Sequence, residues 1–148
     1  MFKNQNTLSK AIEFEGIGLH SGEKVKIVLT PAAQDSGIKF QINKSLISAI
    51  WKNAIVSQLC TRIKFKNDSI STIEHLMAAI SGLGITNLLI KINSNEVPIL
   101  DGSSKEFVEK IKYAGIKEQK KPQKIIKILK KVEYKEKEKF ISITPSEK

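Results

Sequence analysis

Apolar and polar residues alternate in four short segments of the chain, residues 12–14, 25–29, 38–42 and 59–65. Successive side chains of a β-strand point to opposite faces of a sheet, so this alternation predicts half-buried strands. The glycine-rich residues 16–22 separate the first two segments and predict a turn there. A continuous apolar segment at residues 88–92 predicts a further strand.

Two later segments have the period of a helix. Their apolar residues recur at spacings that place them on one side of a helix: Ile73, Leu76, Met77 and Ile80 in the first, and Phe107, Val108 and Ile111 in the second. Each start has a serine three residues before a glutamate, the spacing of a capping box: Ser71 with Glu74, and Ser103 with Glu106. Glycine tolerates the left-handed conformation that ends many helices, so we expect the ends at Gly82 or Gly84 and at Gly115.

The last part of the chain has a different character. Residues 118–123 carry several charges and a proline, and we expect a linker there. Residues 125–132 and 140–143 predict two strands of a β-hairpin around a charged turn at 135–139. An isolated hairpin is only marginally stable in water, so it must pack on the preceding residues or begin another unit. The preceding part predicts an α+β domain, a two-layer sandwich of a small, mostly antiparallel sheet with two helices on one face.

Length and composition limit the class of protein. The chain has 148 residues, with 41% hydrophobic and 27% charged residues, which is typical of one globular domain. It contains no apolar segment of the roughly 18 residues that a membrane span needs, and residues 1–6 lack the core of a signal peptide. The single cysteine, Cys60, cannot form an internal disulfide and is expected to be a small core residue on a strand. We therefore expect a cytoplasmic protein.

The net charge of +10 is concentrated near the C-terminus, because residues 117–148 hold eleven Lys and five Glu. A lysine-rich surface can attract phosphate groups, so a non-catalytic module that holds a nucleotide or an anionic surface is one alternative. A solvated lysine-rich face explains the same pattern. The chain has a single arginine, Arg62, and its aromatic residues form no base-stacking motif, so we expect no nucleic-acid partner.

Glu74 and His75 are the only adjacent carboxylate and imidazole. At 100° per residue, His75 lies opposite the apolar side of its helix, among the small residues Ser71, Ala78, Ala79 and Gly82. Such a surface allows another backbone, a domain or a ligand to approach closely, and we expect a second packed face there. Either Glu74 caps the helix and His75 is a satisfied structural residue, or His75 is a metal ligand beside a general base. The other histidine, His20, lies in the glycine-rich turn, where a substrate-loop role and a plain surface role both remain open.

Five segments resemble one family in their order and spacing: residues 16–22 (GIGLHSG), 59–61 (LCT), 71–79 (STIEHLMAA), 82–87 (GLGITN) and 96–103 (EVPILDGS). Together they resemble the UDP-3-O-acyl-N-acetylglucosamine deacetylases, zinc amidohydrolases of lipid A biosynthesis. The likeness runs from Gln5 to the end of the chain. It implies two similar domains with the active site between them. Residues 1–117 would be the first domain, 118–123 a linker, and 124–148 the starting hairpin of an incomplete second domain.

The resemblance also implies roles for individual residues. It implies that His75 is a zinc ligand and that Glu74 is the general base that takes a proton from the attacking water. Five residues match segments near the substrate cleft of the family: Leu19, His20, Leu59, Cys60 and Thr61. The turn at residues 101–103 is expected to be structural.

The remaining parts of the family's site are absent from this sequence. The family's other zinc ligands come from a His-x-x-x-Asp motif in the second domain, and its general acid is a further histidine there, whereas no histidine follows His75 here. We therefore expect an N-terminal portion, from a truncated or split coding sequence, which binds zinc weakly and is inactive alone. Its implied partners are the UDP-linked acylated N-acetylglucosamine and the missing second domain, with at most peripheral membrane contact.

Overall fold

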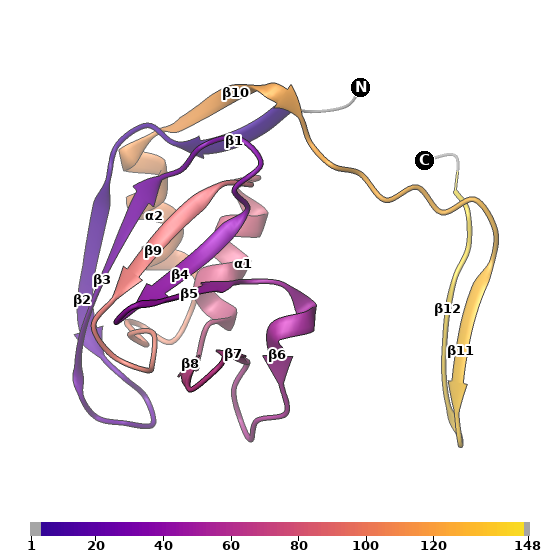
Figure 1. Ribbon diagram of the computed structural model, residues 1–148, viewed down its shortest axis with the longest axis horizontal. Coiled ribbons are helices and arrows are strands. Elements are labelled where there is room, and N and C mark those ends of the chain that lie inside the picture. The colour runs from indigo at the N-terminus through magenta and orange to yellow at the C-terminus, as the bar shows by residue number, and fades with distance from the viewer. Residues whose placement is uncertain (1–3, 147–148) are drawn as a thin grey trace.

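Five strands form the central sheet, in the order β2-β3-β9-β4-β5 (Figure 1). Their bounds are Ile12–Ile17 (β2), Lys24–Pro31 (β3), Leu88–Ile92 (β9), Ile38–Ile42 (β4) and Ser45–Ser48 (β5). Neighbouring strands are antiparallel except for β4 and β9, which are parallel. The alternating segments at 12–14, 25–29 and 38–42 and the apolar segment at 88–92 are therefore confirmed as strands. The computed structural model describes residues 4–146, so residues 1–3, which begin the expected first domain, and 147–148, which end the expected hairpin unit, lie outside the described residues.

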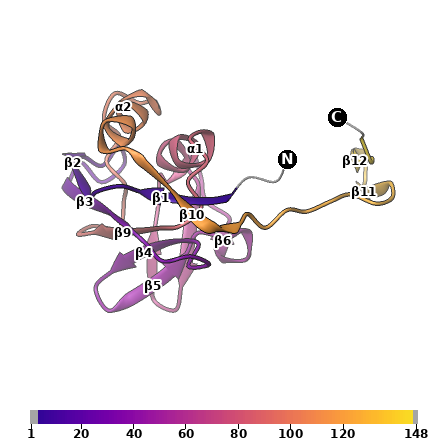
Figure 2. The same cartoon turned by 90° about the horizontal axis from the view of Figure 1, so that it is seen from above.

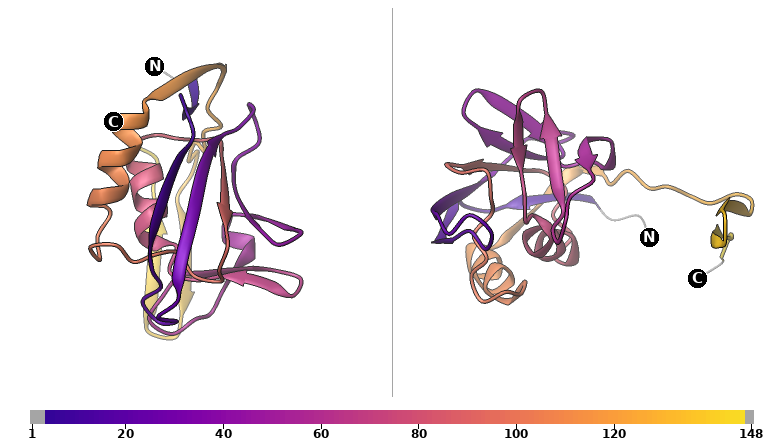
Figure 3. Two further views of the ribbon diagram at one scale, coloured as in Figure 1. Left: turned by 90° about the vertical axis from the view of Figure 1, so that its left-hand side faces the viewer. Right: turned by 90° about the horizontal axis from the view of Figure 1, so that it is seen from below.

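Both helices lie on the same side of the central sheet (Figures 2 and 3). Helix α1 spans Glu74–Gly82 and helix α2 spans Lys105–Ala114. They bury Leu76, Ile80, Phe107 and Ile111 in one core with the sheet residues Phe14, Ile27, Leu29, Phe40 and Ile90. The rings of Phe14 and Phe107 lie 5.0 Å apart between their centroids. This arrangement confirms the expected α+β sandwich, and no helix within residues 4–146 has the length and apolar character to cross a membrane.

A small antiparallel sheet, β6-β7-β8, follows β5. It comprises Ala54–Ile55 (β6), Arg62–Phe65 (β7) and Asp68–Ile70 (β8), preceded by the short 3-10 helix η1 at Trp51–Asn53. The strand expected over 59–65 begins only at Arg62, because Leu59 has a positive φ of 57° that a strand cannot accommodate. The expectation for Cys60 was also wrong: it is half-buried in a bend, with its Sγ 3.1 Å from the hydroxyl of Ser57.

The strands β1 (Asn4–Leu8) and β10 (Ile116–Pro122) pair antiparallel across one end of the domain (Figure 1). Most of the segment expected to be a linker, 118–123, therefore lies in a strand. The sequence of this strand shows little apolar alternation, because polar side chains fasten the strand to the domain. The amide nitrogen of Asn87 donates to Gln5 Oε1 at 2.8 Å and to Gln119 Oε1 at 2.7 Å.

The last two strands, β11 (Val132–Glu136) and β12 (Lys139–Ile143), form the expected hairpin. The first of them starts later than residue 125, and residues 123–130 contain no strand. Every residue of the hairpin is exposed, and Figures 1 and 2 show it set apart from the domain at the end of an extended segment. The hairpin therefore does not pack on the preceding residues.

Neither expected capping box forms. The hydroxyl of Ser71 donates to the carbonyl oxygen of Asn95 at 3.1 Å, and Ser103 bonds with Asp101 and with the N–H of Lys105. The positive φ of Gly115, 81°, ends α2 as expected.

Candidate functional site

Helix α1 begins at the candidate pair itself. Its buried side consists of Leu76, Ala79 and Ile80, which hold the helix against the core. Glu74 is the first helical residue, and no side chain caps the helix. The first turn is therefore fixed by burial of its apolar side, and Glu74 and His75 remain on the other side.

The carboxylate of Glu74 is held by the segment that precedes β7. Its Oε2 accepts a hydrogen bond from the backbone N–H of Thr61 at 3.0 Å, and the N–H of Ile73 bonds to the carbonyl oxygen of Thr61 at 3.4 Å. Within residues 4–146, its other oxygen, Oε1, accepts no hydrogen bond. One oxygen is thus fixed in place and the other is available to a ligand or a water molecule.

His75 is half-buried, and its Nδ1 is buried without a hydrogen-bond partner among the described residues. An unpaired buried nitrogen costs about 1–3 kcal/mol, so such a group needs a partner. Ala78 and Gly82, farther along the same side of the helix, are exposed, and a Cβ at Gly82 would meet no atom within 4 Å. Ser71 and Ala79, the other small residues expected around His75, are buried, so within the described residues this side is packed near the start of the helix and open toward its end.

A buried carboxylate, Glu96, joins the glycine-rich turn to the start of α1. It is 3% exposed and accepts hydrogen bonds from the N–H of His20 at 3.0 Å, the N–H of Ser21 at 2.9 Å and the hydroxyl of Thr72 at 2.9 Å. Thr72 has a positive φ of 57°, which is unusual for a β-branched residue. Glu96 therefore stabilises a strained residue only two positions before Glu74.

Glu96 stays charged in this position. Burial opposes its charged form, but the hydrogen bonds from His20, Ser21 and Thr72 outweigh burial and lower the pKa of Glu96 from 4.5 to about 2. Gly18 makes room for the carboxylate, because a Cβ there would lie 2.5 Å from Glu96 Oε2. No role for Glu96 is predicted from the sequence, because its hydrogen-bond partners lie 24 to 76 positions away and no local pattern marks it.

The structure brings some of the predicted site residues together. Thr61 contacts Glu74 directly, and His20 is linked to the start of α1 through Glu96. Leu19 and Leu59 are exposed, and neither they nor Cys60 takes part in these contacts. The candidate site is therefore one surface built from the turn at 18–22, the segment at 59–61 and the first turn of α1.

Of the two histidines on this surface, His75 has a buried ring nitrogen without a partner among the described residues, whereas His20 is bonded to Glu96 through its backbone N–H. Residues 4–146 contain no group of three or more His, Cys, Asp or Glu side chains that could hold a metal ion. A zinc site requires three or four protein ligands. His75 fits such a site as one ligand, since its buried nitrogen has no competing partner, and the other ligands are not among the described residues.

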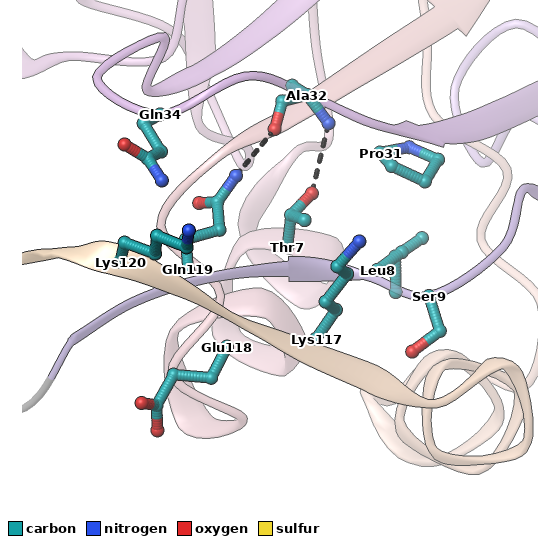
Figure 4. Close-up of a pocket in the computed structure, with 10 residues that line it drawn as sticks. All are labelled: Thr7, Leu8, Ser9, Pro31, Ala32, Gln34, Lys117, Glu118, Gln119 and Lys120. Carbon is teal, nitrogen blue, oxygen red and sulfur yellow. Dashed lines mark hydrogen bonds between the residues drawn. The ribbon is translucent and has the colours of Figure 1, made fainter.

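Figure 4 shows a pocket elsewhere, between β1, β10 and the end of β3. The hydroxyl of Thr7 accepts from the N–H of Ala32 at 3.0 Å, and Gln119 Nε2 donates to the carbonyl oxygen of Ala32 at 2.9 Å. None of the candidate site residues lines this pocket. Its polar contacts fasten β10 to the domain, so we assign it a structural role.

Comparisons with known proteins give one consistent result. The family model described as UDP-3-O-acyl N-acetylglycosamine deacetylase matches residues 5–148. A curated protein named UDP-3-O-acyl-N-acetylglucosamine deacetylase from Nautilia profundicola is 45% identical over 146 residues, which cover 97% of this chain and 50% of the relative. Proteins of the same name from Oleidesulfovibrio alaskensis and Campylobacter fetus are 41% and 40% identical; each match covers 96% of this chain, and 48% and 49% of the respective relatives. The chain thus spans about half the length of the curated relatives that it matches.

Proposed function

Because the chain belongs to the UDP-3-O-acyl-N-acetylglucosamine deacetylase family, we propose that it supplies one side of an active site that hydrolyses the N-acetyl group of UDP-3-O-acyl-N-acetylglucosamine. The observation that carries the proposal is the pairing of Glu74 with His75. Among residues 4–146, one carboxylate oxygen of Glu74 is fixed by Thr61 and the other accepts no hydrogen bond, and the adjacent imidazole has a buried nitrogen without a partner.

In this proposal Glu74 is the general base and His75 is one zinc ligand. When bound, zinc polarises the acetamide carbonyl and acidifies a water molecule. Glu74 takes the proton of the attacking water at Oε1, while the N–H of Thr61 keeps the carboxylate oriented. The products are acetate and a free glucosamine amine.

The turn that carries Leu19 and His20 would contact the substrate. Leu19 is 58% exposed, and the backbone of His20 is anchored by Glu96, so the side chains project from a fixed turn. Leu59, Cys60 and Thr61 would contact the substrate from another side of Glu74, because the N–H of Thr61 bonds to the Glu74 carboxylate.

The remaining zinc ligands and the general acid would come from a second, similar domain. The relatives have about twice the length of this chain, which leaves room for such a domain. The hairpin β11–β12 would be its beginning. Val132, Tyr134, Ile141 and Ile143 share one face of the hairpin through the cross-strand pairs, and all of them are more than half exposed. A hairpin with an uncovered apolar face needs a further layer.

The first experiment combines the chain with the complementary half of a relative. Alone, the 148-residue chain should bind zinc weakly and release no acetate; co-expressed with the second half of the Nautilia profundicola protein, it should recover deacetylase activity. Tight stoichiometric zinc in the isolated chain would contradict the split site.

Glu74→Gln tests the general base in the same combined enzyme. The amide keeps the shape of the side chain but cannot take a proton, so we expect acetate release to fall about 10²- to 10⁴-fold. The zinc content should stay unchanged, because Glu74 is not a ligand in this proposal. Glu109→Gln on the exposed face of α2 is the matched control. Full activity of Glu74→Gln would show that another group is the base.

A further inference from the structure

The region between β5 and β8 exposes several large apolar side chains. Trp51 is 81% exposed, Val56 is fully exposed and Leu59 is 91% exposed. Figure 1 shows β6 at the margin of the domain, and the connection from β6 to β7 ends at Thr61, beside the start of α1. We call residues 50–66 the 50–66 surface. An apolar surface of this kind on a folded domain normally marks a site of contact.

The charged side chains of this region are all positive. Between Asp35 and Asp68 the sequence contains no acidic residue, and it contains six basic ones: Lys39, Lys44, Lys52, Arg62, Lys64 and Lys66. Lys52, Lys64 and Lys66 are exposed, so this positive charge faces the solvent.

Lysine and aromatic side chains are also paired here. The ammonium group of Lys52 lies 5.7 Å from the centroid of the Trp51 ring, and that of Lys66 lies 5.5 Å from the centroid of the Phe65 ring. Aromatic rings beside long cationic side chains are typical of proteins that lie at a membrane–water interface, because rings enter the head-group layer while the ammonium groups stay with the phosphates.

We propose that the 50–66 surface binds the surface of an anionic lipid bilayer, with Trp51 and Val56 entering the head-group region and Leu59 at the edge of the contact that is nearest to the proposed substrate site. The cations of the same surface would contact lipid phosphates. Strand β7 of the small sheet packs beside β5, so the strands that flank this surface belong to the folded domain.

The 50–66 surface lies next to the proposed catalytic residue Glu74. The exposed Val56 and Leu59 lie on the connection that ends at Thr61, whose N–H holds Glu74. A bilayer bound here would place an acylated substrate near the candidate base. This link to catalysis rests on the proposed function, whereas the lipid contact itself does not.

The chain offers a direct probe, since Trp51 is its only tryptophan. The full 148-residue chain is mixed with vesicles of phosphatidylcholine and phosphatidylglycerol, and in parallel with vesicles of phosphatidylcholine alone. We expect the Trp51 emission to shift to shorter wavelength with the anionic vesicles, and lipids brominated in the acyl chain to quench it. Added salt should weaken the effect, because part of the attraction is electrostatic.

A matched pair of double variants locates the contact. Val56→Ser with Leu59→Ser should lower the vesicle partition coefficient on the order of tenfold, because two apolar side chains are lost from the interface. Ile126→Ser with Leu129→Ser changes side chains of similar exposure, 85% and 80%, in the extended lysine-rich segment, and should leave the coefficient unchanged. All four positions are exposed, so both variants should keep the far-ultraviolet circular dichroism of the parent chain.

Three results would overturn the proposal. Unchanged Trp51 emission with anionic vesicles would exclude insertion. Binding that depends on Ile126 and Leu129 but not on Val56 and Leu59 would assign the lipid contact to the C-terminal segment. Protection of Trp51 from iodide only in the combined two-half enzyme would show that polypeptide covers this surface. Because the readout is tryptophan emission, each of these results leaves the proposed deacetylase function standing.

Discussion

Glu96 is the residue whose contacts reach farthest across the candidate site. Its hydrogen-bond partners lie 24 and 76 positions away in the sequence, at Thr72 and His20. Such a role depends on tertiary contacts, so no local pattern reveals it. Glu74 and His75 differ in this respect, because their adjacency and their position on the helix are visible in the sequence.

The depressed pKa of Glu96 predicts how stability depends on pH. A carboxylate whose folded pKa lies at about 2 instead of 4.5 contributes stability that is complete above the unfolded value and is lost as pH falls through the folded value. The contribution at neutral pH is about 3 kcal/mol. Urea unfolding should therefore show Glu96→Gln to be clearly less stable than the parent chain at pH 7.

The difference in free energy of unfolding between Glu96→Gln and the parent chain should decrease progressively from about pH 5 to about pH 2, because the Glu96 carboxylate of the parent chain also becomes neutral in that range. Glu109→Gln, at an exposed position on α2, serves as the control and should differ little from the parent chain. Equal stability of Glu96→Gln and the parent chain at pH 7 would show that the hydrogen bonds of Glu96 do not stabilise the fold.

Two glycines test the packing around the same carboxylate. A methyl group at Gly18 would collide with Glu96 Oε2 and the Ser21 hydroxyl, whereas a methyl group at Gly82 would enter open space. Gly18→Ala should therefore lower the free energy of unfolding by about 1–3 kcal/mol. Gly82→Ala, at the end of α1, should leave it unchanged or raise it by up to about 1 kcal/mol. Thermal unfolding measures the stability of both variants. A Gly82→Ala variant less stable than Gly18→Ala would refute this account of Gly18.

At the scale of elements, the central sheet and both helices follow from apolar periodicity. That signal works because the strands β3, β4 and β9 and the helices each bury one side in a single core. Strand β10 was not predicted from apolar periodicity, because it is held to the domain by hydrogen bonds of polar side chains such as Asn87 and not by burial of apolar residues. The strand expected to begin at Leu59 begins only at Arg62, because the positive φ of Leu59 cannot be recognised from a pattern of apolar residues.

The hairpin β11–β12 gives a prediction at this scale. Its residues are all exposed, so only its own cross-strand bonds protect its amides. In the 148-residue chain, hydrogen exchange followed by mass spectrometry should show rapid exchange over residues 132–143 and slow exchange in β3 and β9. In the combined two-half enzyme the hairpin should become protected. Strong protection in the isolated chain at low concentration would contradict an uncovered hairpin.

At the scale of the whole molecule, part of the positive charge near the C-terminus is neutralised by ion pairs. Among the described residues, two lysines near the C-terminus are in ion pairs: Lys121 of β10 with Asp35, which lies between β3 and β4, and Lys131 with Glu133. The alternative of a non-catalytic lysine-rich binding module therefore has fewer free cations than the sequence indicates, although it stays untested. The two histidines of the sequence lie on different elements: His20 in the turn anchored by Glu96, and His75 on α1.

The central claim is that His75, on this chain, binds the zinc of a site completed by another half. The most direct measurement is the zinc content of the combined two-half enzyme with His75→Ala and, as the matched control, with His20→Ala. We predict that His75→Ala loses zinc and acetate release together, whereas His20→Ala keeps stoichiometric zinc. Full zinc content in His75→Ala would contradict the account.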